Sequence, residues 1–158
     1  MWKETTRYKR NLKIFKEEFE EFLPSKILDF HVHVFPENAI PPGCEKHLES
    51  GGEVVQYTIE ELKQDLTELY PGRDCYAVCF GMPHKELNTS INNEYVAKSC
   101  DHEHFFPLRL LRPEEDPEIV AKDVREKGFL GFKPYLNYVN KPDINDVEIN
   151  DMLPARLM

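Results

Sequence analysis

The chain has 158 residues, of which 41% are hydrophobic and 31% are charged, a composition typical of one globular domain rather than a disordered protein. Its formal net charge of -9 disfavours a nucleic-acid backbone as a partner. No apolar run approaches the ~18 residues of a membrane span, and no signal-type segment opens the chain, so we expect a cytoplasmic protein without a membrane partner.

Cysteine usage agrees with that compartment. The spacing shows no C-x-x-C motif, which favours buried free thiols in a reducing environment over disulfides or metal ligands. The four cysteines are Cys44, Cys75, Cys79 and Cys100.

The first element expected is an amphipathic helix over residues 8–23, ended by Pro24. Its apolar side chains recur at helical spacing, which predicts a face packed against the rest of the domain. The apolar stripe consists of Leu12, Phe15, Phe19, Phe22 and Leu23.

A short strand over residues 27–35 follows, with the sequence Ile-Leu-Asp-Phe-His-Val-His-Val-Phe. Side chains alternate across a strand, so Asp29, His31 and His33 are expected on one face. Two imidazoles and a carboxylate are costly to bury without partners, and a divalent metal would satisfy them. The alternative is a pair of core histidines hydrogen-bonded to the backbone.

Residues 36–52 are rich in proline and glycine, which predicts a long loop over the end of this strand. Glu37 and His47 could reach a site there, with solvated loop residues as the alternative interpretation.

Beyond the loop, strands and helices alternate. Thr58 and Glu61 predict a capping box, Asn88 or Thr89 a second cap, and Asp116-Pro117 a third helix start. The elements expected are a helix over 58–70, a strand over 75–80, a helix to about 100, a strand over 104–111, a helix ended by Gly128 and a strand over 129–136. Polar loop is expected over 137–151, followed by the start of a helix over 153–158. This alternation specifies an α/β fold with parallel strands and right-handed crossovers.

Two segments resemble one family. Asp29-Phe30-His31-Val32-His33, followed by Val34-Phe35-Pro36, resembles the metal-binding signature of the amidohydrolase superfamily, and its continuation is most similar to the amidohydrolase-related branch. Gly131-Phe132-Lys133-Pro134 resembles the fourth-strand segment of that family. The resemblance implies a TIM barrel whose His31 and His33 bind a divalent metal, zinc or alternatively manganese. Asp29 would orient a ligating imidazole, and Lys133 would bind substrate or bridge metals. The alternative for Lys133 is a lysine that only snorkels to the end of its strand.

The chain matches only part of such a barrel. A TIM barrel has eight strand–helix units in ~250 residues, whereas about four are expected here. The later histidine and aspartate ligands of the family have no counterpart, because His84, His102 and His104 lie near strands two and three. We therefore expect a partial (βα)8 barrel preceded by a helix, with weak metal binding and no catalytic base of its own. Its open edges predict a homo-oligomer or a missing C-terminal half as partner.

The activity that the resemblance implies is metal-dependent hydrolysis of a C–N or C–O bond in a small molecule, or the related decarboxylation. One alternative is a metal-dependent phosphoesterase of the polymerase-and-histidinol-phosphatase type, which also opens with His-x-His. That type usually continues with a polar turn, whereas Val34-Phe35-Pro36 follows here. The other alternative is a non-catalytic half-barrel.

Overall fold

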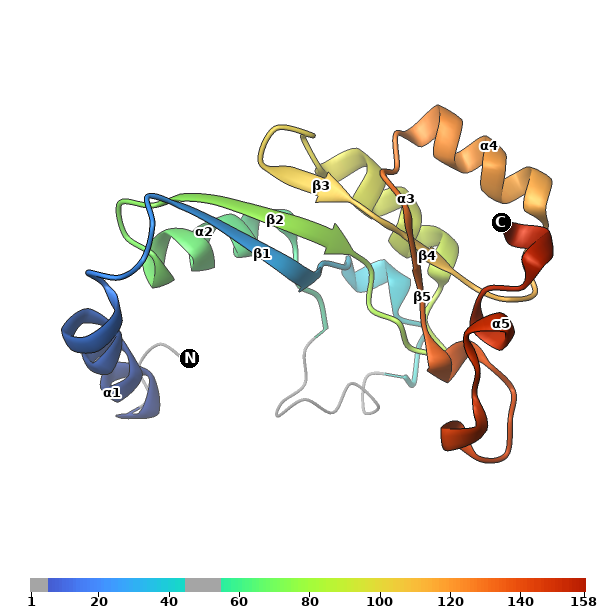
Figure 1. Ribbon diagram of the computed structural model, residues 1–158, viewed down its shortest axis with the longest axis horizontal. Coiled ribbons are helices and arrows are strands. Elements are labelled where there is room, and N and C mark those ends of the chain that lie inside the picture. Colours follow the sequence, from blue (N-terminus) through green and yellow to red (C-terminus); the bar gives the residue numbers. More distant parts are fainter. Residues whose placement is uncertain (1–5, 45–54) are drawn as a thin grey trace.

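The computed structural model describes residues 6–44 and 55–158 of the protein (Figure 1). Within these ranges the fold is mixed α/β, and all the strand pairs between named strands are parallel, as the alternating pattern predicts. One sheet has the order β1-β2-β3 and the other pairs β4 with β5. The strands are β1 (Lys26–His33), β2 (Asp74–Phe80), β3 (Phe105–Pro107), β4 (Arg109–Leu111) and β5 (Phe132–Pro134).

The third predicted strand is interrupted at Leu108, which joins the two sheets. The Leu108 amide donates to the Cys79 carbonyl of β2 at 2.8 Å, whereas the Arg109 amide donates to the Gly131 carbonyl at 3.0 Å. The Pro107 carbonyl accepts from the Leu130 amide at 3.0 Å, so the segment bonds to β2 along one edge and to the β5 side along the other. Its first half therefore pairs with β2 and its second half with β5.

The helices begin where their caps predict. The Thr58–Glu61 capping box opens α2 (Ile59–Leu69), and Asn88 caps α3 (Thr89–Ser99) through a side-chain bond from the Ile91 amide. Asp116 caps α4 (Pro117–Lys127), which ends at Gly128 in the left-handed region with φ of 72°. None of the described helices has the length and apolarity to cross a bilayer.

The main core lies between the helices and one face of the β1–β2 pair. Val32 of β1, Ala77 and Cys79 of β2, and Ile59 and Leu62 of α2 are all buried in one cluster. None of the four cysteines forms a disulfide; Cys79 and Cys100 are buried, and Cys44 and Cys75 are half-buried.

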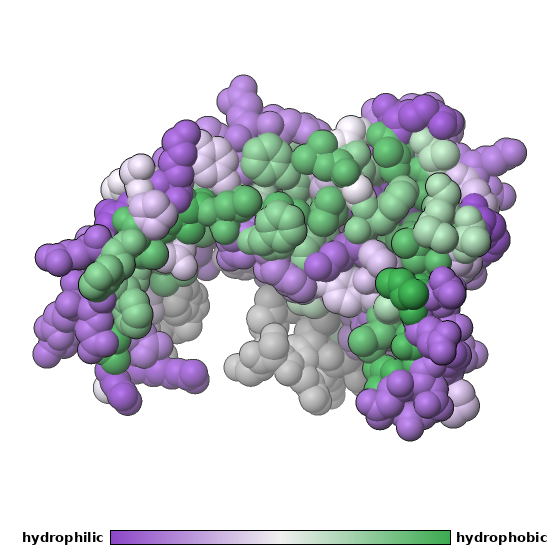
Figure 2. Space-filling model, viewed as in Figure 1, coloured by the Kyte–Doolittle hydropathy of each residue, from purple (hydrophilic) through white to green (hydrophobic). Residues whose placement is uncertain are grey.

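The opposite face of β1 is open. Leu28 is 52% exposed and Phe30 is 70% exposed, although both are large apolar side chains. Figure 2 shows apolar side chains gathered on this side of the molecule, along the path that β1 and β2 follow in Figure 1.

The prediction of a packed N-terminal helix over 8–23 is wrong in extent and in burial. The segment forms α1 (Thr6–Ile14) and then a π-helical turn (Phe15–Phe19), neither of which contains a buried residue. Phe22, expected in the stripe, is 84% exposed. The segment meets the loop after α2, where the Phe15 and Tyr70 rings lie 5.8 Å apart, so Phe15 is half-buried whereas Phe19 and Phe22 stay exposed.

The last part of the chain is more ordered than a polar loop. β5 is shorter than the strand expected over 129–136, and three 3-10 turns and one short helix follow it. These elements are 3-10 turns at Leu136–Tyr138 and Ile144–Asp146, α5 (Ile149–Met152), and a 3-10 turn at Ala155–Leu157 in place of the helix expected there. Leu157 packs against Leu111 and Val120, which ties this segment to α4.

Candidate functional site

Five side chains from three parallel strands gather at the carboxyl ends of those strands. His31 and His33 end β1, Phe80 ends β2, Lys133 lies on β5, and Tyr135 follows directly after it. These residues, named here the histidine cluster, lie on the open face of the sheet. The carboxyl end of parallel strands is also where α/β proteins bind their ligands.

A bulge in β1 sets which side chains reach this face. Asp29 pairs with Ala77 and His33 pairs with Phe80, so four steps along β1 match three steps along β2. Paired residues on neighbouring strands point to the same face of a sheet. Asp29 therefore shares the core-side face of Ala77, and the expectation that it shares the face of the histidines is wrong.

The carboxylate of Asp29 accepts a hydrogen bond from a backbone amide. Its Oδ1 accepts a hydrogen bond of 3.0 Å from the His31 amide, inside the irregular part of the strand. In this position it steadies the bulge that turns the two imidazoles to the open face, and neither imidazole is its hydrogen-bond partner.

The two imidazoles lie together, as strand alternation predicts for this pair. Their ring centroids are 5.2 Å apart at an interplanar angle of 75°. Each ring also packs edge-on against Phe80, at 4.9 Å for His31 and 4.8 Å for His33. Phe80 thus forms the floor on which both rings rest.

His33 is held in the form that binds metals. Its Nδ1 lies 3.0 Å from the Gly81 carbonyl oxygen, which can only accept, so Nδ1 carries the hydrogen and Nε2 keeps its lone pair. Burial lowers the pKa of His33, with further lowering by His31 and Lys133, while the bond to Gly81 acts in the opposite sense. The ring is therefore neutral near pH 7, with Nε2 available to a ligand.

Gly81 was not anticipated as part of the site. A Cβ at this position would lie 2.6 Å from the Cβ of Asn92, so only glycine lets the backbone approach α3 so closely. The glycine that directly follows the apolar run of β2 predicts the end of the strand. It does not predict that the carbonyl of this glycine accepts a hydrogen bond.

Lys133 and Tyr135 approach the histidines from the other side. The Tyr135 hydroxyl lies 3.3 Å from His31 Nε2, and burial raises the pKa of Tyr135, so the phenol stays protonated. Lys133 Nζ lies 4.8 Å from the Phe80 ring centroid and 5.8 Å from that of Tyr135. Lys133 thus points toward the Phe80 ring against which both histidines pack.

The donor set fits part of a metal centre. Two imidazoles can ligate zinc or manganese, but a catalytic zinc site uses three protein ligands. Across residues 6–44 and 55–158, no three His, Cys, Asp or Glu side chains come together in a way that could hold a metal ion. The cluster therefore supplies two ligands and leaves a third to be provided from elsewhere.

Other predicted residues lie away from the cluster. His104 pairs with Asp74 at 3.3 Å, at the start of β2 and so at the opposite end of the sheet. Glu37 is exposed in a 3-10 turn, Glu37–Ala39, while His47 and the rest of the loop from residue 45 on lie outside the described residues.

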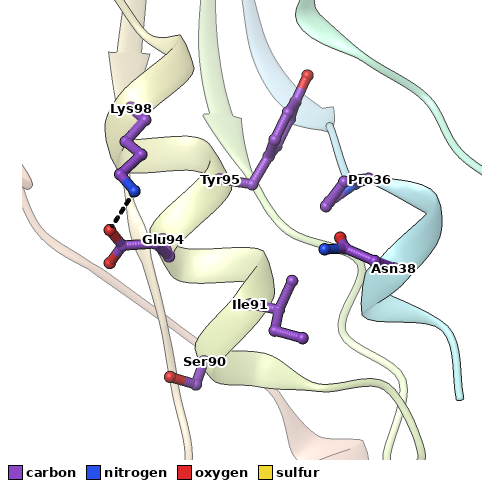
Figure 3. Close-up of a pocket in the computed structure, with 7 residues that line it drawn as sticks. All are labelled: Pro36, Asn38, Ser90, Ile91, Glu94, Tyr95 and Lys98. Atoms are coloured by element: carbon purple, nitrogen blue, oxygen red, sulfur yellow. Dashed lines mark ion pairs between the residues drawn. The ribbon is translucent and has the colours of Figure 1, made fainter.

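A separate groove of about 500 Å³ lies between α3 and the turn after β1 (Figure 3). It contains none of the cluster residues, and its one carboxylate, Glu94, is paired at 2.9 Å with Lys98 and with Lys127. The groove is lined by Pro36, Asn38, Ser90, Ile91, Glu94, Tyr95 and Lys98.

No family model, curated protein or solved structure matches this chain. The evidence for its function is therefore the chemistry of the histidine cluster and the placement of that cluster in the fold.

Proposed function

We propose that this chain is part of a metal-dependent hydrolase of the amidohydrolase type, acting on a C–N or C–O bond of a small molecule or on a related decarboxylation. The observation that carries the proposal is the imidazole pair, with centroids 5.2 Å apart at the carboxyl end of the first parallel strand. A backbone carbonyl fixes the tautomer of one ring, which is how ligating histidines are commonly oriented.

The order of the strands supports a partial (βα)8 barrel. β1, β2 and β3 pair in chain order, and the bonds on either side of Leu108 continue that order to β4 and β5. A barrel requires strands paired successively and staggered relative to one another, with helices outside and ligands at the carboxyl ends. The described half of such a barrel would present the histidine cluster to its interior.

Each residue of the histidine cluster would have its own role in such a centre. His33, through Nε2, and His31 would hold zinc or manganese, while the Gly81 carbonyl keeps the His33 ring in place. The metal would polarise a substrate carbonyl and lower the pKa of its bound water. Lys133 adds positive charge beside the pair, and Phe80 and Tyr135 provide apolar walls that limit the access of water.

Among the residues that the structure describes, the proposed centre lacks a third ligand. The third ligand and a proton-transferring carboxylate would come from the units that close the barrel, either a second copy of the chain or a C-terminal half. We also propose a cytoplasmic location, which the free, buried thiols of Cys79 and Cys100 support.

The test is metal binding to the purified chain, measured by calorimetry with Zn²⁺ and by the visible absorption of Co²⁺. The intact chain should bind one ion weakly, His31→Ala and His33→Ala should each weaken binding about 10-fold or more, and the double variant should not bind. His104→Ala is the control, because His104 lies at the other end of the sheet beside Asp74. Tight stoichiometric zinc in the double variant would refute the proposal.

A further inference from the structure

The segment before β1 forms a helical arm at the end of the sheet opposite the histidine cluster. The arm, residues 6–22, consists of α1, the π-helical turn and the turn after it, and Figure 1 shows it beside the start of β1. The Phe15 ring contacts that of Tyr70, and the Arg73 guanidinium donates to the Glu20 carbonyl at 2.7 Å. These contacts place the arm against the end of α2.

The apolar stripe of the arm is sheltered along its first half and exposed along its second. Leu12 and Phe15 are half-buried at a pocket of about 280 Å³ between the arm and the end of α2, whereas Phe19 is 52% exposed and Phe22 is 84% exposed. The pocket is lined by Tyr8, Asn11, Leu12, Phe15, Leu69 and Tyr70. The arm thus has an apolar pocket towards its start and two exposed phenyl rings towards its end.

The charges of the arm are divided in the same direction. α1 carries four basic side chains and no carboxylate, and residues 15–21 carry four carboxylates and one lysine. The basic side chains of α1 are Arg7, Lys9, Arg10 and Lys13, and the carboxylates are those of Glu17, Glu18, Glu20 and Glu21. Two such arms attract each other when antiparallel and repel each other when parallel.

An antiparallel pair with Phe15 at its centre aligns both features at once. Lys13 then lies opposite Glu17 of the second copy, and Lys9 lies opposite Glu20 of the second copy. The Lys13 and Glu17 side chains are 72% and 61% exposed, although they pair at 3.7 Å within one arm, so both can reach a second arm. The same alignment brings the exposed end of each stripe to the pocket of the other copy.

We propose that the arm pairs with the arm of a second copy in an antiparallel, two-fold arrangement, with Phe19 and Phe22 of each copy in the pocket of the other. Such a contact is self-complementary and closes with two copies. Removal of the phenyl rings from water stabilises the pair, and the charges set its direction. The arm lies away from the histidine cluster, so the pairing does not depend on the proposed metal centre.

The experiment reverses the charges of the arm in the full chain. One variant has an acidic arm, Lys9→Glu with Lys13→Glu, and the other has a basic arm, Glu17→Lys with Glu20→Lys. Sedimentation equilibrium measures the dimer dissociation constant of each variant alone and of their equimolar mixture. Circular dichroism of each sample records the helix content.

All chains in the experiment also carry Leu28→Lys and Phe30→Lys, so that the open face of β1 does not contribute to association. With its native arm this chain should form a dimer that dissociates on dilution and in high salt. A chain that stays monomeric at tens of micromolar would overturn the proposal.

Each charge variant alone should dimerise about 10-fold more weakly or worse, because like charges then face each other across the pair. The mixture should regain the affinity of the native arm, since every reversed charge meets a reversed partner. Variants that dimerise alone as tightly as the native arm, or a mixture no tighter than its components, would overturn the antiparallel pairing.

Phe22→Ala tests the apolar contact separately from the charges. Since Phe22 is 84% exposed, its loss should leave the fold of one copy intact and weaken the dimer about 10-fold or more. The matched control is Ile149→Ala, because Ile149 is 63% exposed on α5, far along the chain from the arm. Equal dimer affinity in Phe22→Ala and the control would overturn the placement of the ring in the pocket.

Discussion

Gly81 connects the core to the site, because its backbone packs against α3 while its carbonyl oxygen holds the His33 ring. We expect Gly81→Ala to lower the free energy of unfolding by about 1–3 kcal/mol, since the new Cβ would overlap Asn92, whose nearest atom is 2.6 Å away. The same shift should draw the carbonyl away from His33 and weaken Co²⁺ binding. Urea unfolding and a Co²⁺ titration measure the two effects.

Gly131→Ala is the matched control, because its Cβ would only reach the end of the Leu108 side chain at 3.4 Å. It should leave both stability and Co²⁺ affinity near those of the intact chain. Equal losses in the two glycine variants would show that Gly81 has no particular role at His33.

For single residues, the alternation of side chains along a strand predicted which of them share a face. His31, His33 and Lys133 face one space because a period of two holds locally along each strand. Alternation failed for Asp29 because a bulge interrupts β1 after it. The bulge depends on the register of β1 against β2, a strand more than 40 residues further along the chain. The Gly81 carbonyl could not be singled out, since every residue carries such an oxygen.

Among the elements, β4 and α4 are joined by a buried charge network. Arg109 is only 3% exposed, and its guanidinium donates to Glu115 at 2.7 and 3.1 Å and to Asp123 at 3.1 Å. Burial raises the pKa of Asp123, but hydrogen bonds from Lys127 and Arg109 outweigh that effect and hold the pKa below its usual 3.8. This carboxylate therefore stabilises the fold above about pH 3.8, and the contribution is lost as the pH falls through the lowered pKa.

Arg109→Met should lower the free energy of unfolding by about 3 kcal/mol near neutral pH, because it leaves Glu115 without its buried cation and Asp123 with Lys127 alone. At about pH 3 the loss should be smaller, since Asp123 without Arg109 takes up a proton more readily and sheds its charge. Urea unfolding at both pH values measures the difference.

Arg156→Met provides the comparison for that experiment. Arg156 is exposed and donates to the carbonyls of Pro113 and Glu115 in the same region, so its loss should cost less and show no such pH dependence. A loss in Arg109→Met that is identical at both pH values would exclude ion pairing as its cause.

The helix starts were predicted well, because the residues that determine them are close in sequence. The caps at Thr58, Asn88 and Asp116 were read from the sequence because capping involves residues within one helical turn. The stripe of Phe19 and Phe22 was misjudged, since periodicity shows that a face is apolar but not what will cover it. The division of the third strand between two sheets was not predicted, since its two edges pair with strands from distant parts of the chain.

For the whole molecule, the open face of β1 predicts self-association. Leu28 and Phe30 are 52% and 70% exposed on a sheet face bordered by unpaired strand edges, and such surfaces are rare on monomers. The chain should therefore sediment as a dimer or larger species at tens of micromolar, and the double variant Leu28→Lys, Phe30→Lys should shift it toward monomer.

Ile119→Lys is the control for this measurement, because Ile119 is 60% exposed on α4 and not on the sheet face. It should leave the sedimentation unchanged. A monomeric intact chain that unfolds cooperatively at the same concentration would contradict the prediction and the proposal of a partner that closes the barrel.

Successive pairing of the strands also sets the order in which the site can form during synthesis. β2 bonds to β1, which precedes it, and β5 bonds to β4, so each new strand meets an edge that is already present. Contacts between consecutive elements close short loops and form early on a growing chain. We expect the histidines to be placed when β1 and β2 pair, whereas Lys133 and Tyr135 can join them only after β5 has left the ribosome and paired with β4. The imidazole pair thus precedes its cationic neighbour along the chain.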